Sequence, residues 1–112
     1  MTERDIQNEI KAVCESLGCL VVRHQSQGNI IGGRKVRKGN NGIWDLYGLT
    51  PYGRFFSIEC KAPGSSTERA HRLRQEAWRD EVLSRQGIAI ITDDPKEVEA
   101  ILAAVIEQDG GQ

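Results

Sequence analysis

Glu59 and Lys61 are the first residues whose types and spacing point to chemistry. They lie in a largely apolar run, residues 55–62, that predicts a β-strand. Because side chains alternate between the two faces of a strand, Glu59 and Lys61 share one face about 7 Å apart, and Ile58 and Cys60 share the other. An acid beside an amine fits either an open cleft or an exposed face with a cross-strand ion pair. The strand alone leaves both possibilities open.

A second carboxylate, Asp45, lies in residues 43–49, which also predict a strand. Residues 50–53 (Thr-Pro-Tyr-Gly) have turn composition, so the two strands should form an antiparallel hairpin that brings Asp45 near Glu59. Two converging carboxylates repel each other unless a cation holds them, and hard oxygen ligands suit Mg²⁺ or Mn²⁺. With Lys61 available to stabilise charge on a phosphate, the trio predicts phosphodiester hydrolysis.

Two polar residues on the predicted helices could belong to the same site. Glu9 lies three residues after Ile6 and four before Val13, on or beside an apolar stripe, although a stripe-edge glutamate that points to solvent has the same pattern. Gln75 lies three residues before Trp78, again near a buried face, where its amide could hold a water or a phosphate oxygen. A surface glutamine explains the second pattern equally well.

The elements that must position these residues follow one another as helix, strand, strand, strand, helix, strand, helix. This order predicts an α/β fold in which a mixed β-sheet is flanked by helices. Cap and stop residues support the helices: Thr2 with Asp5 at the first, and Asp94 with Pro95 at the last. The predicted ranges are a helix at 2–18, strands at 20–22, 43–49 and 54–62, a helix from 66 or 67 to about 86, a strand at 88–92 and a final helix from 95.

Composition predicts one globular domain over residues 1–112, with a tail, residues 108–112, that frays. Residues 88–92 are expected to be buried on both faces of the sheet. No apolar run approaches the roughly 18 residues needed to span a membrane, and the first residues lack an apolar leader. We therefore expect a cytoplasmic protein, with its three cysteines, Cys14, Cys19 and Cys60, as small buried thiols.

The net charge of −1 argues against a protein that coats nucleic acid non-specifically, but the charges are unevenly spread. Residues 25–42 predict a long loop or an irregular hairpin, rich in glycine and asparagine. Four cations of this segment are expected to contact phosphates, namely Arg34, Lys35, Arg37 and Lys38. Arg69 and Arg72 of the second helix could join them. For His24 and His71, a surface or phosphate-contact role is a safer interpretation than metal binding.

Taken in order, these residues resemble the pattern of the PD-(D/E)XK nucleases. The chain is most similar to the VRR-NUC family of virus-type replication and repair nucleases, and the resemblance extends from about residue 2 to residue 100. The Glu-x-Lys pair alone is a weak motif, whereas five elements in order at compatible spacing are more specific. These elements are Glu9, Gly42-Ile43-Trp44-Asp45, Ile58-Glu59-Cys60-Lys61, Gln75, and Gly87 before an apolar strand.

The resemblance implies a restriction-endonuclease-like core and a role for each site residue. Asp45, Glu59 and the backbone carbonyl of Cys60 would bind the metal, and Lys61 would be the catalytic lysine. Glu9 would support the metal or its waters, and Gln75 would be an active-site amide. The sequence departs from the family at Trp44, where the family usually has proline. Proline there shapes the backbone and supplies no ligand, so the implied roles stand.

Small stand-alone members of this family resemble phage or prophage proteins and tend to act as homodimers on branched DNA. The resemblance therefore implies a metal-dependent endonuclease that prefers structures such as four-way junctions, acts in DNA repair and works in a bacterial or phage-infected cell. One alternative is a nucleic-acid-binding module without catalysis. Another is a subunit of a larger replication or repair complex, which nothing in the sequence excludes.

Overall fold

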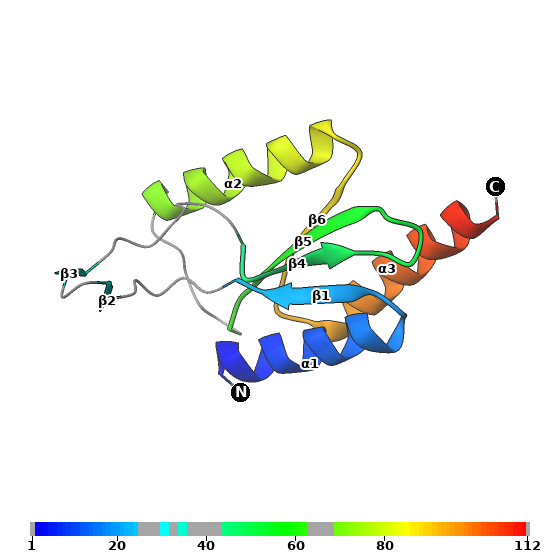
Figure 1. The fold of residues 1–112 in the computed structure, drawn as a ribbon, viewed down its shortest axis with the longest axis horizontal. Coiled ribbons are helices and arrows are strands. Elements are labelled where there is room, and N and C mark those ends of the chain that lie inside the picture. Colours follow the sequence, from blue (N-terminus) through cyan, green and yellow to red (C-terminus); the bar gives the residue numbers. More distant parts are fainter. Residues whose placement is uncertain (1, 25–29, 32–33, 36–43, 63–68, 112) are drawn as a thin grey trace.

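The structure, a computed structural model, describes residues 2–24, 30–31, 34–35, 44–62 and 69–111. These residues form three helices and six strands (Figure 1). In order, they are α1 (Glu3–Ser16), β1 (Leu20–Arg23), β2 (Ile30–Ile31), β3 (Arg34–Lys35), β4 (Leu46–Leu49), β5 (Phe55–Cys60), α2 (Arg69–Ser84), β6 (Ile88–Thr92) and α3 (Pro95–Gly110).

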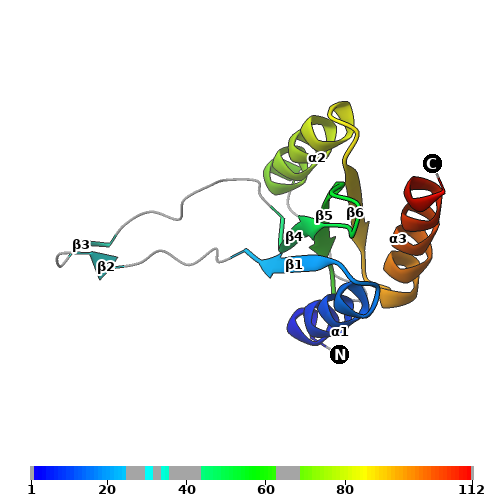
Figure 2. The ribbon, with the colours of Figure 1, turned by 45° about the vertical axis from the view of Figure 1, so that its right-hand side comes forward.

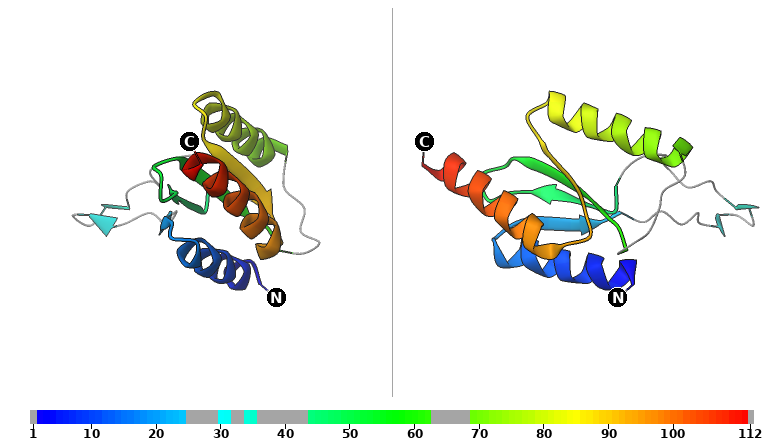
Figure 3. Two further views of the ribbon diagram at one scale, coloured as in Figure 1. Left: turned by 90° about the vertical axis from the view of Figure 1, so that its right-hand side faces the viewer. Right: turned by 180° about the vertical axis from the view of Figure 1, so that it is seen from behind.

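The main sheet has the strand order β1-β4-β5-β6. Strands β1, β4 and β5 are antiparallel neighbours, and β6 runs parallel to β5. Helices α1 and α3 cover one face of the sheet, and α2 lies across the other (Figures 1–3). The mixed sheet flanked by helices that the sequence predicted is therefore confirmed.

Local sequence signals begin α1 and α3 where they were predicted, whereas the predicted start of the second helix, at residue 66 or 67, lies outside the described residues. The Thr2 hydroxyl accepts a hydrogen bond from the Asp5 backbone, and the Asp5 carboxylate accepts one from the Thr2 backbone, so the capping box is complete. Asp94 caps α3 and Pro95 occupies its first turn. Gly18, with a φ of +85°, follows the end of α1, in a conformation that favours glycine.

The alternation of β5 divides its side chains between the two layers of helices. Phe56, Ile58 and Cys60 are fully buried in the core, where they pack with the apolar face of α1 and with α3. Ser57 and Glu59 lie on the opposite face, and the Ser57 hydroxyl accepts a hydrogen bond from the Trp78 indole of α2 at 2.9 Å. One face of this strand therefore builds the core, while the other faces α2.

Strand β6 departs from the prediction of a strand buried on both faces. It lies at the edge of the sheet, and the Ile91 side chain is 37% exposed. An apolar run of five residues does not by itself distinguish an edge strand from a central one. Within the predicted loop or hairpin, the structure describes β2 and β3, which pair antiparallel as a separate two-stranded sheet. The rest of that segment lies outside the described residues.

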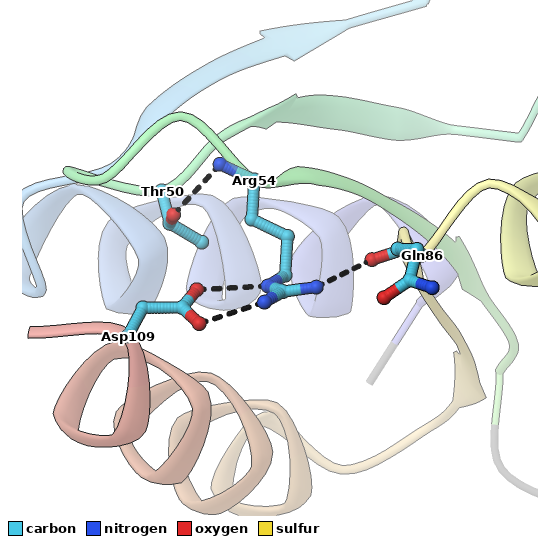
Figure 4. Close-up of polar contacts among 4 residues, drawn as sticks. All are labelled: Thr50, Arg54, Gln86 and Asp109. Carbon is cyan, nitrogen blue, oxygen red and sulfur yellow. Dashed lines mark hydrogen bonds and ion pairs between the residues drawn. The ribbon is translucent and has the colours of Figure 1, made fainter. Parts of the chain in front are cut away.

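The C-terminal tail also differs from its prediction, because residues expected to fray continue α3 to Gly110. Asp109 accepts two hydrogen bonds from the Arg54 guanidinium, at 2.8 and 2.7 Å (Figure 4). Arg54 also donates to the backbone carbonyl of Gln86, just before β6. Arg54, just before β5, therefore connects the end of α3 to the turn after α2 through its bidentate pair with Asp109. The polar composition of the tail did not indicate this contact.

The cysteines confirm their prediction, because Cys14, Cys19 and Cys60 are all buried and free. Burial raises the pKa of the Cys14 thiol to about 12, so this side chain behaves as a small apolar group at neutral pH. Among the described residues, no helix is long and apolar enough to cross a membrane.

Gly48 in β4 allows a close approach of the β1 backbone. A Cβ atom at this position would lie 1.8 Å from the carbonyl oxygen of Leu20, which is backbone and cannot turn aside. We therefore expect Gly48→Ala to lower the free energy of unfolding by about 3 kcal/mol, the upper end of the usual cost of over-packing. Gly111→Ala is the matched control, because a Cβ there meets only ordinary contacts and should change stability by under about 0.5 kcal/mol. Equal urea midpoints for the two variants would contradict this prediction.

Candidate active site

One end of the sheet gathers the residues that the sequence singled out. Strand β4 begins there, β5 ends there, and the N-terminal ends of α1 and α2 lie on either side of it (Figure 1). Polar side chains from four separate elements can therefore meet without entering the apolar core. We call the group of polar side chains at this end of the sheet the candidate active site.

Asp45 and Glu59 lie side by side across the two central strands. Leu46 of β4 pairs with Ile58 of β5 in antiparallel register, so the residues one step further along, Asp45 and Glu59, also face each other. The Asp45 carboxylate accepts a hydrogen bond from the Cys60 backbone N–H at 2.9 Å. Glu59 is buried and Asp45 is half-buried. The predicted convergence of the two carboxylates is thus what the structure shows.

The environment of this pair opposes a double negative charge. Burial raises the pKa of Glu59 to about 7, the negative charge of Asp45 adds to that increase, and the Lys61 ammonium opposes it. Burial also raises the pKa of Asp45, although hydrogen bonds from the Cys60 backbone and with the Glu59 carboxyl lower it in part. The pair therefore holds a proton near neutral pH unless another positive charge replaces that proton.

Lys61 and Gln75 complete the group from the β5 side and the α2 side. The Lys61 ammonium lies 3.6 Å from Glu59 Oε2 and donates to Gln75 Oε1 at 3.1 Å. Gln75 Nε2 donates to Glu59 Oε2 at 2.6 Å. Although Gln75 could have been a surface residue by its sequence pattern, it is buried and bridges the acid and the amine.

The structure does not bring Glu9 to this group. Glu9 is exposed on α1, and the acid of that helix that influences the pair is Glu3, whose negative charge raises the pKa of Glu59. Burial, followed by the charge of Asp45, in turn raises the pKa of Glu3. The helical period could have identified Glu3 from the sequence. Glu3 lies seven residues, or two turns, before the buried Ile10 and so shares its face of the helix, whereas Glu9 lies beside that face.

Both histidines lie beside the site, which the sequence analysis did not predict. The His24 backbone N–H donates to the Asp45 carbonyl at 2.8 Å, and the charge of His24 lowers the pKa of Asp45. His71 Nε2 lies 3.0 Å from Gln75 Nε2. The sequence could have predicted the contact between His71 and Gln75, because residues four apart are neighbours on the surface of a helix.

Only part of the predicted nucleic-acid surface falls within the described structure. Arg69 and Arg72 are exposed in the first turn of α2, on the same helix as Gln75. Arg34 and Lys35 form β3, but their side chains are outside the description, as are residues Arg37 and Lys38 altogether. Trp44, the residue before Asp45, is buried.

The donor atoms at this site fit a small, hard cation. The buried Glu59 and the half-buried Asp45 both have raised pKa values, and they offer oxygen ligands and negative charge that a divalent ion would balance. Within the described residues, no three histidine, cysteine, aspartate or glutamate side chains lie close enough to hold a metal ion by themselves. An ion here would therefore combine Asp45 and Glu59 with backbone oxygen and water, a ligand set typical of Mg²⁺.

Comparison with known proteins finds a solved structure with a similar fold. A solved structure titled "VRR_NUC domain" matches over 92% of this chain and 97% of its own length, with a TM-score of 0.60 and 21% sequence identity. The chain therefore has the fold of the VRR_NUC domain, and the restriction-endonuclease-like core implied by the sequence resemblance is confirmed. No protein-family model and no curated protein matches the chain.

The raised pKa of Glu59 makes stability depend on pH. Its ordinary value is 4.5 and its folded value is about 7, so the folded chain binds this proton more tightly than the unfolded chain. Stabilisation from the bound proton is fully present below pH 4.5 and is lost as the pH rises to about 7. We expect the metal-free wild type to lose more stability than Glu59→Gln over this range in urea titrations with a chelator present. Identical pH dependence in the two proteins would contradict the assignment.

Proposed function

We propose that this protein is a member of the VRR-NUC family that hydrolyses DNA phosphodiester bonds with the help of a divalent metal ion. The observation that supports this proposal most strongly is the pairing of the half-buried Asp45 with the buried Glu59, with the Lys61 ammonium 3.6 Å from Glu59. This arrangement lies at the end of the central strands of a fold shared with a VRR_NUC domain. Acid, acid and amine are the groups that metal-assisted phosphodiester hydrolysis requires.

Mg²⁺ or Mn²⁺ is the proposed cofactor, held by the carboxylates of Asp45 and Glu59 and by the backbone carbonyl of Cys60. Such an ion lowers the pKa of a bound water and stabilises negative charge on a phosphate. Between the two acids, Glu3 is better placed than Glu9 to support the ion through water, because its charge raises the pKa of Glu59 and the charge of Asp45 raises its own. Glu9 keeps this role only if α1 shifts when DNA binds.

The protein's own groups would then act on the phosphate and on each other. Lys61 offers a positive charge that is held in place by Gln75 and Glu59, so it need not reorganise as negative charge develops on the phosphate. The Gln75 amide keeps the acid and the amine apart at a fixed spacing. The site thus offers a preorganised positive group beside two metal-binding oxygen donors.

DNA is the proposed substrate, with branched structures such as four-way junctions preferred. Arg69 and Arg72 are exposed near the site end of α2, where they can contact phosphates. We assign the same role to the cations of the segment between β1 and β4, which are Arg34, Lys35, Arg37 and Lys38. Contacts to the backbone rather than to bases favour recognition of DNA shape.

A second copy of the chain is the proposed partner, since paired cuts in a symmetric junction need two sites and this domain has one. Helix α2 packs over β5 and β6, while on the same face apolar side chains of β1 and β4 are exposed, namely Leu20, Val22 and Leu49. Burial of these side chains would stabilise a two-fold dimer. The proposed setting is the cytoplasm of a bacterial or phage-infected cell, in DNA repair.

Removing one carboxylate tests the metal site directly. We expect Asp45→Ala to abolish cleavage of flap, nicked and four-way-junction DNA with Mg²⁺ or Mn²⁺, while DNA binding is kept or improved because a repulsive charge is gone. Titration calorimetry should show that Mn²⁺ binding is lost as well. Asp80→Asn, an exposed acid on α2, is the control that should keep both properties. Undiminished cleavage by Asp45→Ala would contradict the proposal.

Removing the amine separates catalysis from metal binding. We expect Lys61→Ala to lower the cleavage rate by about 10²- to 10³-fold, as when one electrostatic donor to a transition state is lost. Metal binding and circular dichroism should stay unchanged. Lys11→Ala, which removes an amine from a surface ion pair on α1, provides the comparison. If wild type and Lys61→Ala both bind DNA but neither cuts any substrate, the chain is instead a non-catalytic binding module or subunit.

A further inference from the structure

The Gln75 side chain is fully engaged by three neighbours. Its oxygen accepts from the Lys61 ammonium at 3.1 Å, and its nitrogen lies 2.6 Å from Glu59 Oε2 and 3.0 Å from His71 Nε2. A primary amide has two N–H donors and one carbonyl acceptor. Both donors of this buried amide and its carbonyl oxygen therefore have a partner at hydrogen-bonding distance.

The two charged neighbours determine which way the amide points. The Lys61 ammonium has only donors, so it must face the amide oxygen. The opposite orientation would place the amide N–H groups against the ammonium and the amide oxygen against the Glu59 carboxyl. Because the site contains one donor-only group and one acidic group, the Gln75 nitrogen must point toward Glu59 and His71.

This orientation also limits which tautomer of His71 can accept from the amide. An amide N–H can donate to Nε2 only when that ring nitrogen carries no proton, so the 3.0 Å contact is a hydrogen bond in the tautomer with its proton on Nδ1. An imidazole with a proton on Nε2 would place two donors 3.0 Å apart. The residue is exposed in the first turn of α2, so its ring has no core-packing role to explain this placement.

We propose that His71 is a positioning residue for the Lys61–Gln75–Glu59 group, which acts by accepting a hydrogen bond from the Gln75 amide. The inference rests on the proposed nuclease function and adds a residue that the family pattern does not include. His71 stops the amide from rotating away from the amine, and the amide holds Lys61 at the distance from Glu59 that the reaction uses. The acceptor nitrogen, rather than a charge, is the feature that matters.

The tautomer of His71 provides a test that does not depend on activity. We expect ¹⁵N NMR of wild type at pH 8 to show an unprotonated Nε2 and a protonated Nδ1 for His71. In Gln75→Met, which keeps the length of the side chain but has no donor, His71 should revert toward a mixture of tautomers, while the signals of His24 stay unchanged. A protonated Nε2 in wild type would overturn the proposal.

Two substitutions at His71 provide the kinetic test. A glutamine places its carbonyl oxygen at about the reach of Nε2, whereas an asparagine is one methylene shorter. We expect His71→Asn to lower kcat by roughly three- to tenfold, the size of one neutral hydrogen bond, with KM unchanged. His71→Gln should retain kcat within about twofold of wild type, since it restores the acceptor. Mn²⁺ binding by calorimetry should be the same in all three proteins.

The outcomes separate this inference from the proposed function. If His71→Asn and His71→Gln both raise KM and leave kcat alone, His71 contacts DNA and does not position Gln75. If both lower kcat equally, the acceptor is not the feature that matters. If wild type cuts no DNA, the nuclease proposal fails, while the tautomer measurement still decides whether His71 holds the amide.

Discussion

The close approach of Asp45 and Glu59 is the constraint on which the rest of this structure depends. Burial of two adjacent carboxylates is unfavourable, because each loses hydration and each repels the other's charge. The molecule compensates with the Cys60 backbone N–H, the Lys61 ammonium and the Gln75 amide. It does so only partly, because the pKa values of both acids stay raised. A folded chain that maintains such a pair has a site suited to a cation.

The fold places the two carboxylates outside the apolar core. Phe56, Ile58 and Cys60 use one face of β5 to pack with α1 and α3, so the polar residues need only the other face. The site also lies where β4 begins and β5 ends, and polar backbone and side chains at a strand end can remain in contact with solvent (Figure 1). Charged chemistry and core packing therefore occupy opposite faces of the same strand.

Helix α2 connects the fold to the site through two polar contacts with β5. Trp78 donates to Ser57, and one turn earlier Gln75 donates to Glu59, so the helix is held in register with the strand. Residues a further turn toward the helix start, such as His71, are then delivered to the site end. The packing of α2 on β5 thus also sets the position of the Lys61 ammonium, which Gln75 holds.

Periodicity and turn chemistry were sufficient to predict the central part of this protein. The period of two in β5 placed Glu59 and Lys61 on one face, and the turn at residues 50–53 fixed a hairpin that brought Asp45 opposite them. The first relation joins residues two apart on one strand, and the second depends on a four-residue turn between two consecutive strands. Local geometry determines such relations, so sequence reasoning can recover them.

Contacts between distant segments were decided only in the tertiary structure. Glu3 rather than Glu9 influences Glu59 because α1 packs with its first turn at this end of the sheet, while Glu9 in the second turn is exposed. The tail is helical because Asp109 meets Arg54, 55 residues away. Edge position exposes Ile91 although its strand is largely apolar. The sequence alone determined which residues share a strand face, because that follows from backbone geometry. Packing decided which helix residues reach the site, because docking depends on the whole core.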